Sequence, residues 1–172
     1  MQNLIAAAKL DANALDVRAS QVLLAPLVCE LWEELADAET SYRKLELGIG
    51  AEIAVLADPA LIRQALANVV ENAIKFSPRG SAVTIDAEER GGRVVLRVRD
   101  RGLGAPPATL ARLFERFYRA PNAGEGGTGL GLYIARSFVE SQGGHICASV
   151  PADGGAGLTV ALDLPSARST RP

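Results

Sequence analysis

Apolar and polar positions follow their most regular pattern between residues 61 and 78, in the segment LIRQALANVVENAIKFSP. Apolar side chains recur at helical spacing along one stripe of this segment: Ile62, Leu66, Val69, Val70, Ala73 and Ile74. Asn68, Asn72 and Lys75 share the opposite stripe, because they are spaced four and then three residues apart. The pattern predicts one helix that presses its apolar stripe against a sheet and holds two amides and an ammonium beside whatever lies above it.

Capping residues mark both ends of this helix. Asp58 and Pro59 combine an N-cap acceptor with a residue preset for the first helical turn, and the segment from Phe76 to Gly80 ends the helix. Upstream, the periodicity predicts a short helix at residues 1–16, a short strand at 22–24 and an amphipathic helix at 25–42. Two strands, 44–49 and 52–56, are predicted to pair as a small hairpin around Gly50.

Downstream, alternating apolar positions predict a second hairpin, made of strands 83–87 and 94–98. Two helices follow at residues 110–118 and 129–142, and two more strands at residues 145–150 and 157–164. The glycine-rich stretch 120–128 is predicted to form a lid before the second of these helices, and residues 166–172 a frayed tail. Because strands and helices are interspersed throughout, the fold class is predicted to be mixed α/β.

Composition narrows the class of protein. The chain has 172 residues, of which 48% are hydrophobic, enough for one domain with its own core. A net charge of −2 gives no general attraction for nucleic acid, so no such partner is expected. No apolar run reaches the roughly 18 residues that a membrane span needs, so no membrane contact by this chain is expected. Cys29 and Cys147 lack metal-ligand spacing and are predicted to be buried, reduced thiols.

Two local features suit a phosphate-rich ligand. The amides of Asn68 and Asn72 suit a Mg²⁺ ion already carried by phosphates, and Lys75 supplies a positive charge for the anion. Asp100 ends a predicted strand just before Gly102, where its carboxylate can accept a hydrogen bond from an exocyclic amine such as that of adenine. The simpler alternatives are solvated helix residues and an aspartate in a turn.

A third feature is the glycine-rich run that opens the helix after the predicted lid. Gly127, Gly129 and Gly131 remove side-chain bulk beside Thr128 and Leu130, so successive backbone N–H groups can cradle a phosphate chain. The run is neither a dinucleotide fingerprint nor a P-loop, because no strand precedes it and no Gly-Lys-Ser/Thr sequence follows it.

Four segments, taken in chain order, resemble the N, G1, F and G2 boxes of sensor histidine kinases: residues 61–78, 100–104, 114–119 and 127–132. The resemblance covers about residues 22–165. It implies a two-layer Bergerat ATP-binding fold of the α+β kind, with a mixed, mostly antiparallel sheet of about five strands backed by three helices. It also implies ATP on the open face of that sheet, beneath the lid.

The resemblance implies roles for individual residues. Asn72 would ligate Mg²⁺, while Asn68 and Lys75 would contact the phosphates or the water shell of the metal. Asp100 would accept the adenine amine. The other implied positions are Gly102 and Gly104 around adenine, Phe114 and Phe117 as anchors of the lid, Arg116 or Arg119 near the phosphates, and Gly127, Thr128, Gly129, Leu130 and Gly131 along the triphosphate. Asn68, Lys75, Arg116 and Arg119 would be the catalytic residues.

Two alternatives to a histidine kinase stay open. The same fold carries ATPases of the gyrase and Hsp90 kind and serine kinases that act on anti-sigma partners. In the gyrase-like ATPases a glutamate one turn before the metal asparagine acts as a base, whereas this chain has Asn68, which cannot take a proton near neutral pH. We therefore expect transfer to a nucleophile such as histidine. The second alternative is an interaction module that has lost nucleotide binding.

The only histidine, His145, begins a predicted strand, so the phosphoacceptor is expected outside this chain. The resemblance implies that residues 1–19 are the end of a dimerisation-domain helix and a linker, 20–165 the catalytic domain, and 166–172 a disordered tail. The expected partners are the dimerisation and phosphoacceptor domain of the same kinase and a response regulator. The expected location is the cytoplasm, with the parent protein anchored in the inner membrane.

One position departs from the pattern of the family. Many relatives carry a threonine directly after the glycine of the last box, where it holds adenine through water. Here Leu158 follows Gly157, and Thr159 is predicted to face the other side of the strand. The sequence therefore does not predict the water-bridged contact.

Overall fold

The computed structural model describes residues 16–35, 43–120, 127–151 and 156–170. Its helices and strands follow in this order, with three short 3₁₀ turns labelled η: β1 (Ser20–Leu23), α2 (Leu24–Leu35), β2 (Lys44–Gly48), β3 (Ala54–Ala57), α3 (Pro59–Phe76), β4 (Ala82–Arg90), β5 (Arg93–Arg99), η1 (Pro107–Thr109), η2 (Ala111–Phe114), α4 (Gly131–Glu140), β6 (His145–Ser149), β7 (Thr159–Pro165) and η3 (Ala167–Thr170).

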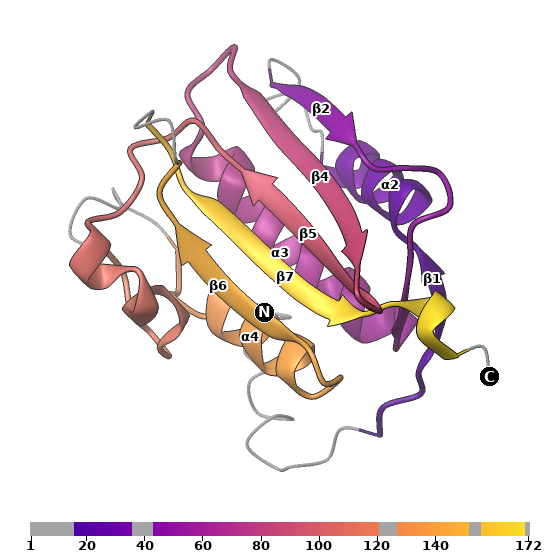
Figure 1. Cartoon of the computed structure of the whole chain (residues 1–172). Coiled ribbons are helices and arrows are strands. Elements are labelled where there is room, and N and C mark those ends of the chain that lie inside the picture. The colour runs from indigo at the N-terminus through magenta and orange to yellow at the C-terminus, as the bar shows by residue number, and fades with distance from the viewer. Residues whose placement is uncertain (1–15, 36–42, 121–126, 152–155, 171–172) are drawn as a thin grey trace.

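Five strands form the main sheet in the order β2-β4-β5-β7-β6 (Figure 1). The pairs β4–β5, β5–β7 and β7–β6 are antiparallel, whereas β2 runs parallel to β4, with Leu45 opposite Val83. Strands β1 and β3 pair antiparallel in a second, two-stranded sheet. The prediction of a mixed, mostly antiparallel five-stranded sheet is therefore confirmed.

The predicted hairpin around Gly50 is wrong. Strands β2 and β3 belong to different sheets, because β3 pairs with β1 and β2 pairs with β4. Parallel pairing of β2 with β4 needs a crossover connection, and that connection contains β3 and α3. The predicted hairpin of β4 and β5 is confirmed, and its turn places Gly91 and Gly92 at φ 58° and 74°.

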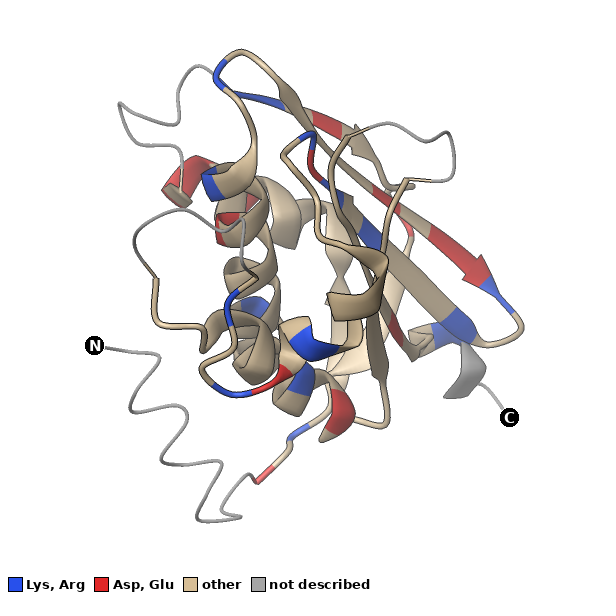
Figure 2. Ribbon diagram, turned by 90° about the vertical axis from the view of Figure 1, so that its left-hand side faces the viewer, with Lys and Arg blue, Asp and Glu red and all other residues tan. Residues whose placement is uncertain are grey.

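The helices and the main sheet form two layers (Figures 1 and 2). Helix α3 has the predicted cap: the side chain of Asp58 accepts hydrogen bonds from the backbone N–H groups of Ala60 and Leu61. All six residues of its apolar stripe are buried. They face alternate strand residues that are buried as well: Val83, Ile85, Val94, Leu96, Val98, Val160, Leu162 and Leu164. This core fixes the helix firmly against the sheet.

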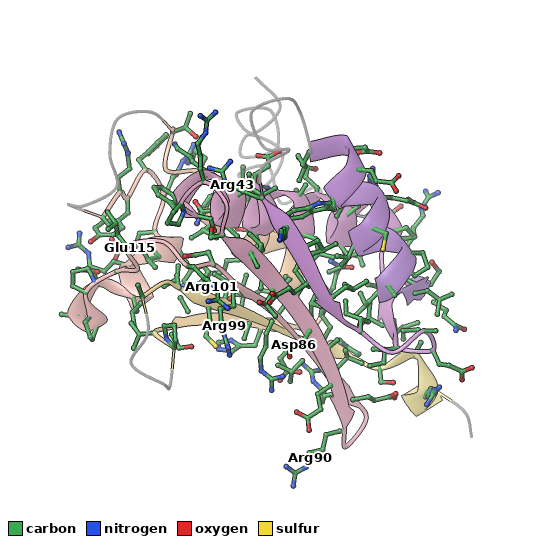
Figure 3. The ribbon with its side chains drawn as sticks, turned by 90° about the horizontal axis from the view of Figure 1, so that it is seen from above. Arg43, Asp86, Arg90, Arg99, Arg101 and Glu115 are labelled. Carbon is green, nitrogen blue, oxygen red and sulfur yellow. The ribbon has the colours of Figure 1, made fainter. Side chains whose placement is uncertain are left out.

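The other face of the sheet carries charged residues. Arg97 forms an ion pair with Asp86 at 3.1 Å, and Figure 3 shows Asp86, Arg99 and Arg101 on the side away from the helices.

The two cysteines are exposed. Cys147 lies on β6 directly opposite Ala161. Cys29 on α2 is exposed too, so the thiols are free but the prediction that they are buried is wrong. Among the described residues, no helix has the length and apolar character needed to cross a membrane.

Several predicted elements have other bounds. The predicted helix 110–118 is wrong, since only the 3₁₀ turn η2 forms there, directly after η1, which begins at Pro107. Helix α2 is described from Leu24 to Leu35, and α4 begins at Gly131 rather than at residue 129. The predicted helix at residues 1–16 falls outside the described residues except at its last position, and so do residues 36–42 and most of the predicted lid, residues 121–126.

The end of the chain is more ordered than the predicted frayed tail. Ser166 is buried, pairs with Val55 of the small sheet, and hydrogen-bonds to Glu89 of the main sheet. Arg168 adds ion pairs to Glu52 and Glu89. These contacts hold Ser166 and Arg168 against distant segments, so the chain is ordered there and continues into the 3₁₀ turn η3. Residues 171–172 lie outside the described part, so the predicted disordered tail stays a prediction for them.

Candidate functional site

A pocket of about 270 Å³ opens on the helical side of the molecule. Helix α3, the start of α4 and the segments after β5 surround it. The polar stripe of α3 faces this pocket with Asn68, Asn72 and Lys75, as the sequence predicts, and Glu71 joins them. The pocket thus lies beside α3, which differs from the expected position on the open face of the sheet.

The two asparagines present oxygen donors from a rigid support. Asn68 is only 6% exposed, and its Nδ2 donates a hydrogen bond to the carbonyl oxygen of Gln64 at 3.0 Å. This bond turns Oδ1 toward Gly131, where an added Cβ would lie 3.4 Å from that oxygen. Asn72 lies one turn further along the same stripe. Amide oxygens beside a carboxylate are the hard ligands that Mg²⁺ prefers, so this donor set fits a magnesium ion that keeps most of its ligands from phosphate and water.

The glycine-rich run passes over the polar stripe of α3. A Cβ at Gly127 would lie 2.8 Å from the Nζ atom of Lys75, so the ammonium reaches the backbone of the run. Gly129 has φ 67° and packs against the backbone of Phe117, whose N–H donates to the Gly129 carbonyl at 3.0 Å. The run leads into the first turn of α4, whose N-terminal N–H groups attract anions.

Asp100 lies elsewhere in the pocket wall and is buried. Its Oδ1 accepts hydrogen bonds from the backbone N–H of Gly102 at 2.8 Å and of Leu158 at 3.1 Å. Burial raises the pKa of this carboxyl group, and the two hydrogen bonds act in the opposite direction. Because both bonds go to Oδ1, Oδ2 is the oxygen that remains for a ligand donor such as an amine.

Close backbone contacts fix Asp100 in place. A Cβ at Gly157 would lie 2.0 Å from the carbonyl oxygen of Asp100, and one at Gly102 would lie 2.4 Å from the carbonyl oxygen of Phe76. Gly104 has φ 65°, and a Cβ there would lie 2.6 Å from the Gly157 carbonyl oxygen. These three positions therefore need glycine because neighbouring backbone leaves no room for a side chain.

The structure brings together most of the residues proposed from the sequence. Ten of them line the pocket: Asn68, Asn72, Lys75, Asp100, Gly104, Arg119, Gly127, Thr128, Gly129 and Gly131. Gly102 packs against the backbone of the lining residue Phe76, and Leu130 is buried in the core. Their roles toward a ligand stay predictions.

The remaining candidates lie away from the pocket wall. Phe114 is buried in the core, whereas Phe117 is 58% exposed and has the unusual φ of 61°. The guanidinium of Arg116 lies 5.1 Å from the centre of the Phe117 ring. Of the two arginines proposed near the phosphates, only Arg119 lines the pocket.

Sequence reasoning missed other lining residues. Glu71 is exposed toward the pocket, and partial burial raises its pKa. Tyr118 also lines the pocket, and the guanidinium of Arg112 lies 4.3 Å from the centre of its ring. The lining is otherwise mostly apolar: Phe76, Leu103, Ala105, Leu113, Ala120, Leu132 and Leu158. The i to i+3 spacing of Asn68 and Glu71 was the available signal for the glutamate.

Leu158 and Thr159 lie as the sequence predicts. Leu158 lines the pocket beside Asp100. Thr159 is absent from the wall, and its buried Oγ1 has no hydrogen-bond partner in the described part of the chain. The wall next to Asp100 is thus apolar at this position.

Comparison with known proteins identifies the family. The family model described as histidine kinase-, DNA gyrase B-, and HSP90-like ATPase matches residues 57–168. The sensor-like histidine kinase SenX3 of Mycobacterium tuberculosis (strain ATCC 25618 / H37Rv) is 42% identical over 119 residues, which cover 67% of this chain and 28% of SenX3. The sensor protein kinase PmrB of Pseudomonas aeruginosa is 35% identical over 176 residues, which cover 100% of this chain and 36% of PmrB.

Solved structures agree with these matches. The mycobacterial sensor histidine kinase MprB has a TM-score of 0.78 at 28% identity, covering 86% of this chain and 98% of the MprB chain. Full-length ShkA, solved in complex with AMPPNP, has a TM-score of 0.80 at 28% identity, covering 96% of this chain and 35% of ShkA. The chain spans about a third of the length of the curated relatives, 28% of SenX3 and 36% of PmrB. It belongs to the family of histidine kinase-, DNA gyrase B- and HSP90-like ATPases, and within that family it is an ATP-binding domain of the sensor histidine kinase type.

Proposed function

We propose that this domain binds ATP together with Mg²⁺ and transfers the γ-phosphoryl group to a histidine on a separate dimerisation domain. The observation that carries the proposal is the distribution of groups in one pocket. The buried carboxylate of Asp100 offers an acceptor for an amine, while the amides of α3, Lys75 and the first turn of α4 suit a metal-bound phosphate chain. The match to sensor histidine kinases supports the same role.

Each group has a chemical task in this proposal. The metal, when bound, supplies positive charge that neutralises the phosphates. Asn72 would hold it, with Asn68 contributing to its water shell. Lys75 and Arg119 would bind phosphate oxygens, and Oδ2 of Asp100 would accept the adenine amine. The imidazole nitrogen of the acceptor histidine then attacks the γ-phosphorus in line, the bond to the bridging oxygen breaks, and ADP leaves.

Hydrolysis is the competing reaction for the same pocket. Asn68 occupies the place one turn before Asn72 where the gyrase-like ATPases of this fold use a base, and an amide cannot take a proton there. We therefore expect the γ-phosphoryl group to be retained until a histidine arrives. The proposed partners are accordingly the dimerisation domain of the same kinase and, after transfer, a response regulator.

Label transfer tests the proposal. The chain is incubated with γ-labelled ATP, Mg²⁺ and a supplied dimerisation domain from a related kinase. Acid-labile label on that domain, lost when its acceptor histidine is changed to glutamine, is the expected result. Steady phosphate release without label transfer would instead favour an ATPase. The variant Asn72→Ala should remove the Mg²⁺-dependent part of nucleotide affinity, and unchanged affinity would contradict the assigned metal ligand.

A further inference from the structure

Glu71 is a carboxylate that the proposed reaction does not use. It lies on α3 directly before Asn72 and one turn before Lys75, and it lines the pocket. In the described part of the chain it has no hydrogen-bond or ion-pair partner. Glu30 and Glu34 contact Arg63, and Glu140 contacts Arg136, whereas Glu33 on the exposed side of α2 has no ion-pair partner among the described residues either. Glu71 differs from Glu33 in its position, because its unpaired carboxylate lines the pocket beside Asn72 and Lys75. This position points to a role toward the ligand.

The surroundings of Glu71 favour anions. Lys75 and Arg119 carry positive charge in the same wall, and the glycine run presents backbone N–H groups and the first turn of α4. A negative charge placed among them repels a bare triphosphate. The same charge attracts a divalent cation, and it lies next to the amide proposed to hold that cation. The charge of Glu71 should thus weaken binding of the metal-free nucleotide and strengthen binding of the metal-loaded nucleotide.

We propose that Glu71 makes the pocket select the magnesium-loaded nucleotide over the metal-free nucleotide. The inference rests on the proposed function, because it assumes that the triphosphate lies over the polar stripe of α3. Glu71 is a specificity-determining residue in this scheme, and it takes no part in bond making or breaking. Asp100 does not serve the same purpose, because its carboxylate is buried and engaged by two backbone N–H groups.

The test compares binding with and without metal. A fluorescent ATP analogue is titrated by anisotropy into the parent and into Glu71→Gln, once with saturating Mg²⁺ and once with EDTA, at one pH and one ionic strength. Glutamine keeps the shape of the side chain and removes its charge. We expect Glu71→Gln to bind the metal-free analogue about tenfold more tightly, since one partly screened charge is removed, while binding with Mg²⁺ changes little or weakens. The preference for the metal-loaded form then falls about tenfold.

Two controls sharpen the result. Glu33→Gln makes the same change in net charge at an exposed position of α2 that does not line the pocket, so the preference should stay as in the parent. Glu71→Asp keeps the charge and should keep most of the preference. Equal effects of Glu71→Gln on both forms, or none, would overturn the inference while the parent still binds nucleotide. A parent that binds neither form would overturn the proposed function and the inference with it.

Discussion

Replacing Gly157 with alanine tests the close packing that holds Asp100 in place. A Cβ at Gly157 would lie 2.0 Å from the carbonyl oxygen of Asp100, and the backbone there has φ 123°. A residue with a side chain at such a φ costs about 1–3 kcal/mol, and the forced movement of neighbouring backbone adds about 1–3 kcal/mol. We therefore expect Gly157→Ala to lower the free energy of unfolding by about 2–6 kcal/mol, a large part of the roughly 5–15 kcal/mol that stabilises a typical domain.

Urea denaturation followed by circular dichroism measures this loss. The matched control is Gly91→Ala, because Gly91 also has a positive φ, 58°, but a Cβ there would meet nothing within 4 Å. Its expected cost is only the backbone strain, about 1–2 kcal/mol. Equal free energies of unfolding for the two variants would refute the reasoning. Folded Gly157→Ala should in addition bind an ATP analogue more weakly than Gly91→Ala, because the Asp100 backbone has to move.

Three other variants probe the N-cap of α3, the Asp100 side of the pocket and the core. Asp58→Ala should lower the free energy of unfolding by about 1 kcal/mol in urea denaturation at neutral pH. Backbone hydrogen bonds lower the folded-state pKa of Asp58 below 3.8, so the stability difference between parent and variant should vanish as the pH falls through that lowered pKa; a difference that persists in strong acid would contradict the assigned cap. Asp100→Asn should have a melting temperature no lower than that of the parent at neutral pH, because burial raises the Asp100 pKa and disfavours the ionised form. The same variant should bind ATP at least about tenfold more weakly in a titration, and unchanged binding would argue against the adenine contact. Leu66→Ala should lose about 2–5 kcal/mol in the same denaturation assay, and a much smaller loss would mean that the core can close around the gap.

Helix α3 could be predicted from the sequence to within a residue or two because its signals are local. Asp58 and Pro59 start it, Ser77 and Pro78 end it, and the spacing of Asn68 and Asn72 places both amides on one side. The same local signals placed β4, β5 and their turn. These features depend on residues a few positions apart, so chain order alone was sufficient.

Pairing between distant segments could not be predicted in this way. The parallel pairing of β2 with β4, the exposure of Cys147 and the anchoring of Ser166 by Glu89 all depend on which strands become neighbours. Glu71 is a mixed case: its spacing of three residues from Asn68 was a local signal, but the pocket that it lines is completed by the glycine run and the segment after β5, both far away in sequence.

Helix α3 also limits how this domain can diverge. Its apolar stripe packs against the sheet and its polar stripe lines the pocket, so the same helix supports the core and supplies the surface of the site. The positions of α3 outside both stripes include Arg63, with its ion pairs to α2, and the partly buried Gln64 and Ala67. A saturation-mutagenesis map should show permissive positions there rather than along the two stripes, and engineering a new nucleotide preference is better begun in the loops around the cavity than on the helix itself.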